Sequence, residues 1–228
     1  MDDSRRVWAV VAALVLLSLG VSVLARAPGP GAAAAAAEPA DGAWKITPAR
    51  RAAGPRFDAA VSAADQAWIR AAIAQARPEA RPLIDEIDGY VTFSTVDSGD
   101  YLGLTLPSPD GTPIVLNVGY LDRDRTVDRN QTVLHELGHV IDAALIDPAT
   151  DASLEAGIPR AGTCAESAGV PIGACAKPNE RFADTFAKWA LRGAVSVTGG
   201  GYGVPMPPSL ETWGAPLTAL GVEVSQRG

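Results

Sequence analysis

The sequence predicts an α+β fold, and two patterns carry that prediction. Between residues 90 and 118, apolar and polar residues alternate in three short runs, which is the period of β-strands. Before and after this stretch, apolar residues recur every three to four positions, as they do on the buried face of a helix. We therefore expect a small antiparallel sheet, with helices on both sides of it along the chain.

Two helices are expected before the sheet. Ser62 has the position of an N-cap, and the helix after it should run to about Ala76, because Pro78 cannot continue a helix. Apolar residues at helical spacing predict a second, shorter helix around residues 83–87.

The three strands are expected at residues 90–96, 102–106 and 114–118, with turns at 98–100 and 109–111. Short turns between consecutive strands favour antiparallel pairing of neighbours. The three strands together are expected to form an antiparallel sheet.

A long helix should follow, over residues 129–146. Asp128 can cap its first turn and form a capping box with Gln131, and Pro148 should end it. The next segment, residues 147–179, is rich in Gly, Pro and Ala and is expected to be a long irregular excursion.

A second long helix is expected over residues 179–190, because its aromatic residues share one face and its acidic residues share another. The aromatic residues are more typical of a core than of a substrate pocket; they are Phe182, Phe186 and Trp189. A short amphipathic segment around residues 210–220 should close the fold.

The N-terminal residues indicate export. Arg5 and Arg6 precede an uncharged apolar run over residues 7–25, which is the layout of an export signal. An A-x-A cleavage site at residues 25–27 favours release, whereas the length of the run would also allow an uncleaved anchor. Residues 1–27 are therefore expected to be a signal peptide or a membrane anchor, and the protein to be extracytoplasmic.

An Ala/Pro/Gly-rich linker is expected at residues 28–43, followed by one catalytic domain over residues 44–228. Because an exported protein meets oxidising conditions, its two cysteines, Cys164 and Cys175, are expected to form a disulfide. The net charge of −7 argues against nucleic acid as a partner, since such partners call for a basic surface.

The only two histidines of the chain, His135 and His139, belong to one H-E-x-x-H motif. At this spacing both side chains lie on one face of a helix and can bind a single ion. A catalytic zinc site needs a third protein ligand, which must here be a carboxylate because no histidine remains. Glu180 is the best candidate because it lies on the second long helix, where Asp184, one turn later, could accept a hydrogen bond from a ligand imidazole.

The two motifs resemble those of the gluzincin metallopeptidases, which carry H-E-x-x-H on one helix and E-x-x-x-D on another. The run Glu-x-Phe-Ala-x-x-Phe at residues 180–186 is most similar to the catalytic domain of the anthrax lethal factor group. The resemblance covers residues 132–190. It implies a zincin-like fold, in which a small antiparallel sheet is joined by an active-site helix and a second ligand-bearing helix.

The resemblance also implies roles for individual residues. His135, His139 and Glu180 would bind Zn²⁺, Glu136 would be the general base, and Asp184 would support the ligands from outside. The lethal factor group has an oxyanion-stabilising tyrosine shortly before the ligand glutamate, but this chain has no tyrosine between residues 120 and 202. Tyr202, an arginine or a backbone amide would have to replace it.

The expected function is that of an exported zinc-dependent endopeptidase acting on a protein or peptide substrate. By analogy with zincins, an extended peptide would pair with the strand at residues 114–118. Two alternatives remain: a noncatalytic cell-envelope binding domain with a structural or vestigial zinc site, and a zinc amidase acting on cell-wall peptides. A general base at Glu136 favours an enzyme, because a structural site has no use for one. The sequence leaves the oligomeric state open.

Overall fold

The computed structural model describes residues 54–99, 101–105, 111–123, 128–167, 170–194 and 203–227. All of them belong to one compact unit, Gly42–Gly228. The expected export segment at residues 1–27 and the linker at residues 28–43 lie outside the described residues. Within the described part, no helix is long and apolar enough to cross a membrane.

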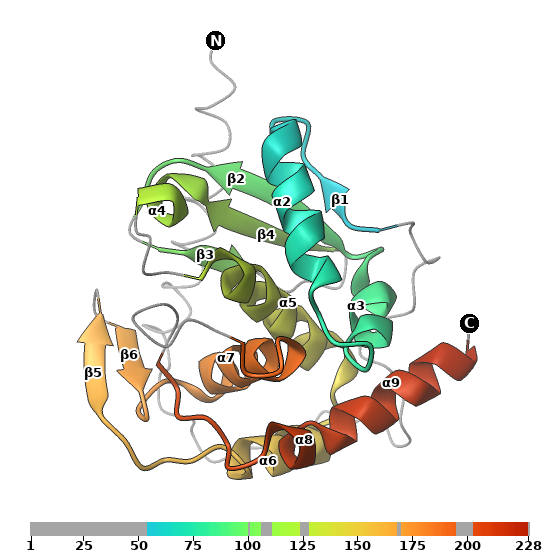
Figure 1. The fold of residues 1–228 in the computed structure, drawn as a ribbon, viewed down its shortest axis with the longest axis vertical. Coiled ribbons are helices and arrows are strands. Elements are labelled where there is room, and N and C mark those ends of the chain that lie inside the picture. Colours follow the sequence, from blue (N-terminus) through green and yellow to red (C-terminus); the bar gives the residue numbers. More distant parts are fainter. Residues whose placement is uncertain are drawn as a thin grey trace, which may run out of the picture. The chain divides into compact units, whose positions relative to one another are not determined.

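The unit combines a small sheet with several helices, which agrees with the expected α+β class. Four strands form the main sheet in the order β1-β2-β4-β3 (Figure 1). Their bounds are β1 Arg56–Phe57, β2 Val91–Val96, β3 Gly103–Thr105 and β4 Thr112–Asn117.

The expectation of a wholly antiparallel sheet is wrong. β4 inserts between β2 and β3, so that it pairs with β2 in parallel, in register from Val91↔Thr112 to Val96↔Asn117. β1 also pairs with β2 in parallel, and only β3 and β4 are antiparallel. The physical reason is burial: β4 is apolar enough to fill the interior position, whereas β3 is short and only partly buried and takes the edge.

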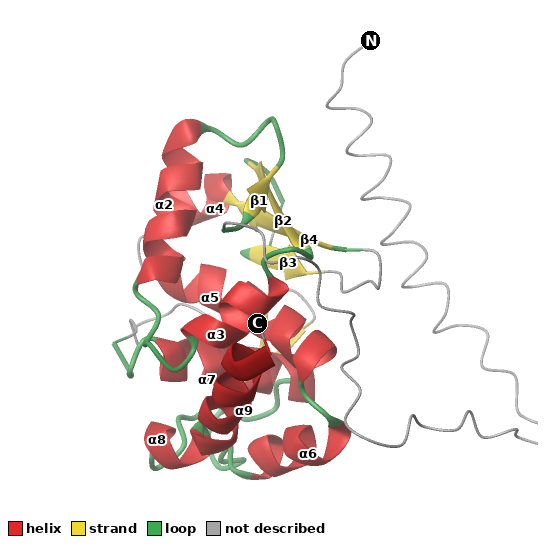
Figure 2. Ribbon diagram, turned by 90° about the vertical axis from the view of Figure 1, so that its right-hand side faces the viewer, coloured by secondary structure: helices red, strands yellow, loops and turns green. Residues whose placement is uncertain are grey.

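Two helices lie between β1 and β2 in the sequence, and a third follows β4. α2 (Ala63–Ala74) begins at the expected cap, where the Ser62 side chain accepts a hydrogen bond from the Asp65 amide. α3 (Arg81–Ile87) packs against the next long helix, and α4 (Val118–Arg123) follows β4 directly. Figure 2 shows α2, α3 and the central helix α5 on the same side of the sheet.

Asp88, the residue that follows α3, has a buried carboxyl group. Asp88 is 6 % exposed, and this burial, helped by the charge of Asp85, raises its pKa to about 6 although Arg81 opposes the shift. The charged form of Asp88 is therefore disfavoured in the folded protein.

The central helix α5 (Arg129–Leu145) is buried along most of its length. Its cap forms as expected, because the Asp128 carboxylate accepts hydrogen bonds from the amides of Asn130 and Gln131. The expected capping box is wrong, since the Gln131 side chain instead donates to Asp184 on another helix. Tertiary packing thus outweighs the local capping pattern.

Residues 147–179 are more regular than expected. Asp147 caps a helix, α6 (Pro148–Ala156), so that Pro148 begins this helix. A two-stranded antiparallel hairpin follows, formed by β5 (Cys164–Ser167) and β6 (Val170–Gly173). The expected disulfide between Cys164 and Cys175 is present.

A buried arginine holds this segment to the next helix, α7 (Pro178–Ala190). Arg181 is 1 % exposed; its guanidinium pairs with Glu155 on α6 at 2.8 Å and donates to the carbonyls of Ala174 and Ile158. Adjacent in sequence to Glu180, it joins α6 and the hairpin to the helix that carries the expected third ligand.

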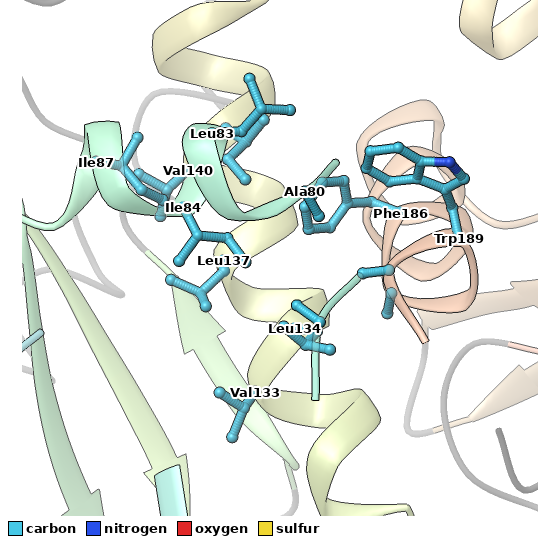
Figure 3. Close-up of a cluster of buried hydrophobic side chains, with 14 of the residues drawn as sticks. Ala80, Leu83, Ile84, Ile87, Val133, Leu134, Leu137, Val140, Phe186 and Trp189 are labelled. Carbon is cyan, nitrogen blue, oxygen red and sulfur yellow. The ribbon is translucent and has the colours of Figure 1, made fainter. Parts of the chain in front are cut away.

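The core lies where α5 meets α3 and α7 (Figure 3). α7 contributes the three aromatic residues that were expected to be buried, and all are 1 % exposed or less: Phe182, Phe186 and Trp189. α5 and α7 approach closely at Gly138, where an added Cβ would lie 3.1 Å from the Cα of Ala183. The chain ends in α8 (Leu210–Trp213) and α9 (Ala215–Arg227), which replace the single amphipathic segment expected near residues 210–220.

Candidate metal centre and cleft

The two histidines of α5 converge as their spacing predicts. The Nε2 atoms of His135 and His139 are 3.1 Å apart, and the rings meet edge to face with centroids 4.8 Å apart. Both side chains are largely buried, with 8 % and 12 % exposed. One turn of helix therefore brings two nitrogen donors to a single point.

Glu180 completes the group from the first turn of α7 (Figure 1 shows α5 and α7 side by side). Its Oε2 lies 3.2 Å from His135 Nε2 and 3.3 Å from His139 Nε2. Three donor atoms thus form a nearly equilateral triangle, and the three residues form a group that could hold a metal ion.

The charges of this group support one another. Burial opposes the ionisation of Glu180, but hydrogen bonds with His135 and His139 and their positive charge hold its pKa well below the usual range. Burial likewise opposes protonation of His135, but the bond to Glu180 and the charges of Glu136, Glu180 and Asp184 raise its pKa overall. Three carboxylates therefore favour a positive charge at His135, as a cation site requires.

Glu136, the expected general base, lies in the same cleft but outside the donor triangle. It is 4 % exposed, and its Oε2 accepts a hydrogen bond of 2.6 Å from the Thr105 hydroxyl on β3. Gly103, on the same strand, faces this carboxylate so closely that an added Cβ would lie 2.7 Å from Glu136 Cδ.

Asp184 lies one turn after Glu180 and is fully buried. Its carboxylate accepts hydrogen bonds from Gln131 Nε2 at 3.0 Å and from Lys188 Nζ at 2.5 Å, and Lys188 also donates to the Val204 carbonyl. Asp184 was expected to support a ligand imidazole. In the structure it forms an i,i+4 pair with Lys188, which is buried, and joins α7 to α5 through Gln131.

The cleft lies between β3, α5 and α7. It is lined by Gly103, Leu104, Thr105, His135, Glu136, His139, Asp142, Ala143, Asn179 and Glu180. Its strand wall is β3, the edge of the sheet, because β4 has partners on both sides. The expectation that the strand at residues 114–118 would offer a free edge to a peptide is therefore wrong.

Several residues of the site were not anticipated. The order of the strands brings Thr105 and Gly103 to Glu136, and the crossing of the helices brings Gln131 to Asp184. Neither arrangement can be predicted from a local sequence pattern. Thr105 lies in an anticipated strand, but its meeting with Glu136, 31 positions later, is a tertiary contact. Tyr202, one of the residues considered for oxyanion stabilisation, lies outside the described residues.

The assignment of a candidate metal centre stands on the convergence of two imidazoles and one carboxylate from separate helices. Comparison with models of protein families, with curated proteins and with solved structures found no match to this chain.

Proposed function

We propose that this protein is an exported zinc-dependent endopeptidase of gluzincin type, with a zincin-like catalytic domain. The observation that carries the proposal is the donor triangle of His135, His139 and Glu180 beside the carboxylate of Glu136 in one cleft. Separate helices supply the two halves of this arrangement, so helical spacing alone does not account for it.

The donor set suits zinc in chemistry and in size. In a tetrahedral zinc site with bonds of about 2.0–2.1 Å, neighbouring ligand atoms lie about 3.3 Å apart. The three separations in the triangle are 3.1, 3.2 and 3.3 Å. Two imidazoles and one carboxylate are also a set found in catalytic zinc sites, which leave one position open.

The chemistry divides between the ion and the chain. A zinc ion in such a site acts as a Lewis acid and lowers the pKa of a water molecule toward neutrality. Glu136 then accepts a proton from the attacking water and passes it to the leaving amine. Its partial enclosure by β3 keeps the carboxylate in the cleft, while the triangle residues hold the ion.

A structural zinc site is a poorer fit. Such sites are normally closed by four protein ligands, whereas among the described residues three donors converge and line a cleft. The buried carboxylate of Glu136 in that cleft would also cost free energy without serving a structural site. These two features favour catalysis over the alternative of a noncatalytic envelope-binding domain.

Export and substrate class belong to the same proposal. The apolar run at residues 7–25 and the disulfide Cys164–Cys175 both suit a protein outside the cytoplasm. The edge strand β3 beside the donor triangle suits an extended peptide, because its outer side can add a strand. A protein or peptide substrate completes the proposal, and the net charge of −7 argues against nucleic acid as a partner.

The test measures cleavage of a denatured protein by the full chain, with and without a chelator, beside the zinc content. We expect one zinc per chain and cleavage that the chelator abolishes. Glu136→Gln should keep the zinc and lose cleavage, whereas Glu223→Gln, at an exposed glutamate of α9, should keep both. Cleavage that persists in Glu136→Gln, or that ignores the chelator, would refute the proposal.

A further inference from the structure

We infer that Thr105 and Gly103 of the edge strand β3 position the general base, with the Thr105 hydroxyl holding one carboxylate oxygen of Glu136 and the bare backbone of Gly103 making room for the other. Both residues act through Glu136, so they are positioning residues. The inference rests on the proposed function, since it assigns how that function's base is oriented.

The hydrogen bond from Thr105 is the first observation. Its Oγ1 lies 2.6 Å from Glu136 Oε2 and 3.3 Å from the Glu136 carbonyl oxygen. A hydroxyl carries one proton, and the shorter, charge-assisted contact is the stronger, so the proton points to the carboxylate. One acceptor site of Glu136 Oε2 thus takes the Thr105 proton, and the inference assigns to Oε1 the acceptance of a proton from water.

The close approach of Gly103 is the second observation. A Cβ at this position would lie 2.7 Å from Glu136 Cδ, 2.8 Å from Cγ and closer still to Oε1. Gly103 is extended backbone within β3 and is absent from the described residues with positive φ. The observed position of the carboxylate therefore depends on glycine at residue 103, because any Cβ there would displace the Glu136 side chain.

The two contacts come from a single short strand. Gly103 and Thr105 are two positions apart and so face the same side of β3, where they meet the carboxylate from both sides. β3 is held in register by β4, with Thr105 opposite Ile114, and it packs against α5. The Glu136 side chain thus extends from α5 and is held at its carboxylate by a second element, β3, as a precise catalytic geometry requires.

Removing the hydroxyl should release the carboxylate without unfolding the protein. Thr105→Val keeps the shape of the side chain and its strand propensity, and Thr105→Ser keeps the hydroxyl. We expect Thr105→Val to lower kcat about tenfold with KM within about twofold, because only the orientation of the base is lost. Thr105→Ser should restore most of kcat. The matched control is Thr92→Val on β2, away from the cleft, which should leave kcat unchanged.

Crystal structures test the same inference without an activity assay. Crystal structures of the metal-free full chain should show one orientation of the Glu136 carboxylate in wild type and in Thr105→Ser. In Thr105→Val the carboxylate should turn or split into two orientations. In Gly103→Ala it should be displaced, and kcat should fall while zinc content is kept.

The outcomes separate this inference from the proposed function. An unmoved carboxylate in Thr105→Val, or an unchanged kcat in an active enzyme, would overturn the inference. Loss of zinc in Thr105→Val would also overturn it, because the role would then lie in the metal site. A wild type that binds zinc but cleaves nothing, with the carboxylate turned in Thr105→Val, would refute the peptidase and support the positioning contact.

Discussion

The contact between α5 and α7 at Gly138 should control both stability and metal binding. An added Cβ would lie 3.1 Å from the Cα of Ala183, 3.2 Å from a ring carbon of Phe186 and 3.3 Å from the Ala183 carbonyl oxygen. Favourable carbon–carbon contacts lie at about 3.5–4.0 Å. Because two of the three atoms are backbone, the helices must separate by roughly 0.5 Å to admit an alanine.

The expected cost follows from two opposing effects. Overpacking in a well-packed core costs about 1–3 kcal/mol, while alanine gains about 1 kcal/mol over glycine in a helix interior. Gly138→Ala should therefore lower the free energy of unfolding by about 1 kcal/mol. A shift of α7 would also move Glu180, and metal ligands tolerate only about 0.2 Å, so zinc affinity should fall about tenfold or more.

The assay is urea unfolding of the metal-free protein together with zinc titration against a competing chelator. Ala71→Gly, at an exposed position within α2, calibrates the helix-propensity effect alone and should cost about 1 kcal/mol without touching zinc affinity. A Gly138→Ala variant that is more stable than wild type by this amount, with unchanged zinc affinity, would refute the reasoning.

Three further predictions concern residues outside the donor triangle and the cleft. Arg181→Met should lower the free energy of unfolding by about 3 kcal/mol, because it removes the buried ion pair with Glu155, which keeps only the exposed Arg160, and the hydrogen bonds to the Ala174 and Ile158 carbonyls; a change below about 1 kcal/mol in urea unfolding would contradict this. Replacing both Cys164 and Cys175 by serine should cost about 3 kcal/mol for a loop of this size, and equal unfolding midpoints for this variant and the oxidised wild type would contradict it. Asp88, whose pKa of about 6 lies above its ordinary 3.8, stabilises the fold below about pH 4 and loses that contribution as pH rises through 6. Relative to Asp88→Asn, wild type should thus lose about 2 kcal/mol between pH 4 and 7, and parallel stability profiles would show that the group is not perturbed.

The candidate metal residues could be predicted because helical periodicity is a local property. Spacing placed His135 and His139 on one face of α5, and elimination of other histidines pointed to a carboxylate at Glu180. The structure brings all three donor atoms within 3.3 Å of one another. Their meeting across two helices depends on the α5–α7 crossing, which the sequence implied only through the resemblance.

The order of the strands could not be predicted, because it depends on burial across the whole sheet. Three consecutive runs with short turns suggest a meander, yet β4 enters between β2 and β3. Because of this insertion, β3 is an edge strand of the sheet, and Thr105 contacts Glu136. The strand that meets the cleft was therefore misassigned.

Local sequence patterns also could not predict which polar side chains pair with one another in the core. Gln131 matches a capping box by position, but its side chain is more stabilising against the buried Asp184 than in a solvated first turn. In the same way, Lys188 and Asp184 match a surface pair, yet both are buried, and Lys188 also donates to the Val204 carbonyl. Such contacts are decided by which faces the helices bury.

Whether three side chains hold a zinc ion can be read from an anomalous-scattering map, recorded at the zinc edge from crystals of the zinc-loaded full chain. We expect one peak at about 2.1 Å from His135 Nε2, His139 Nε2 and Glu180 Oε2, with a fourth position open to the cleft of Glu136. A map without a peak at this triangle, or with zinc bound there by a fourth side chain, would contradict it.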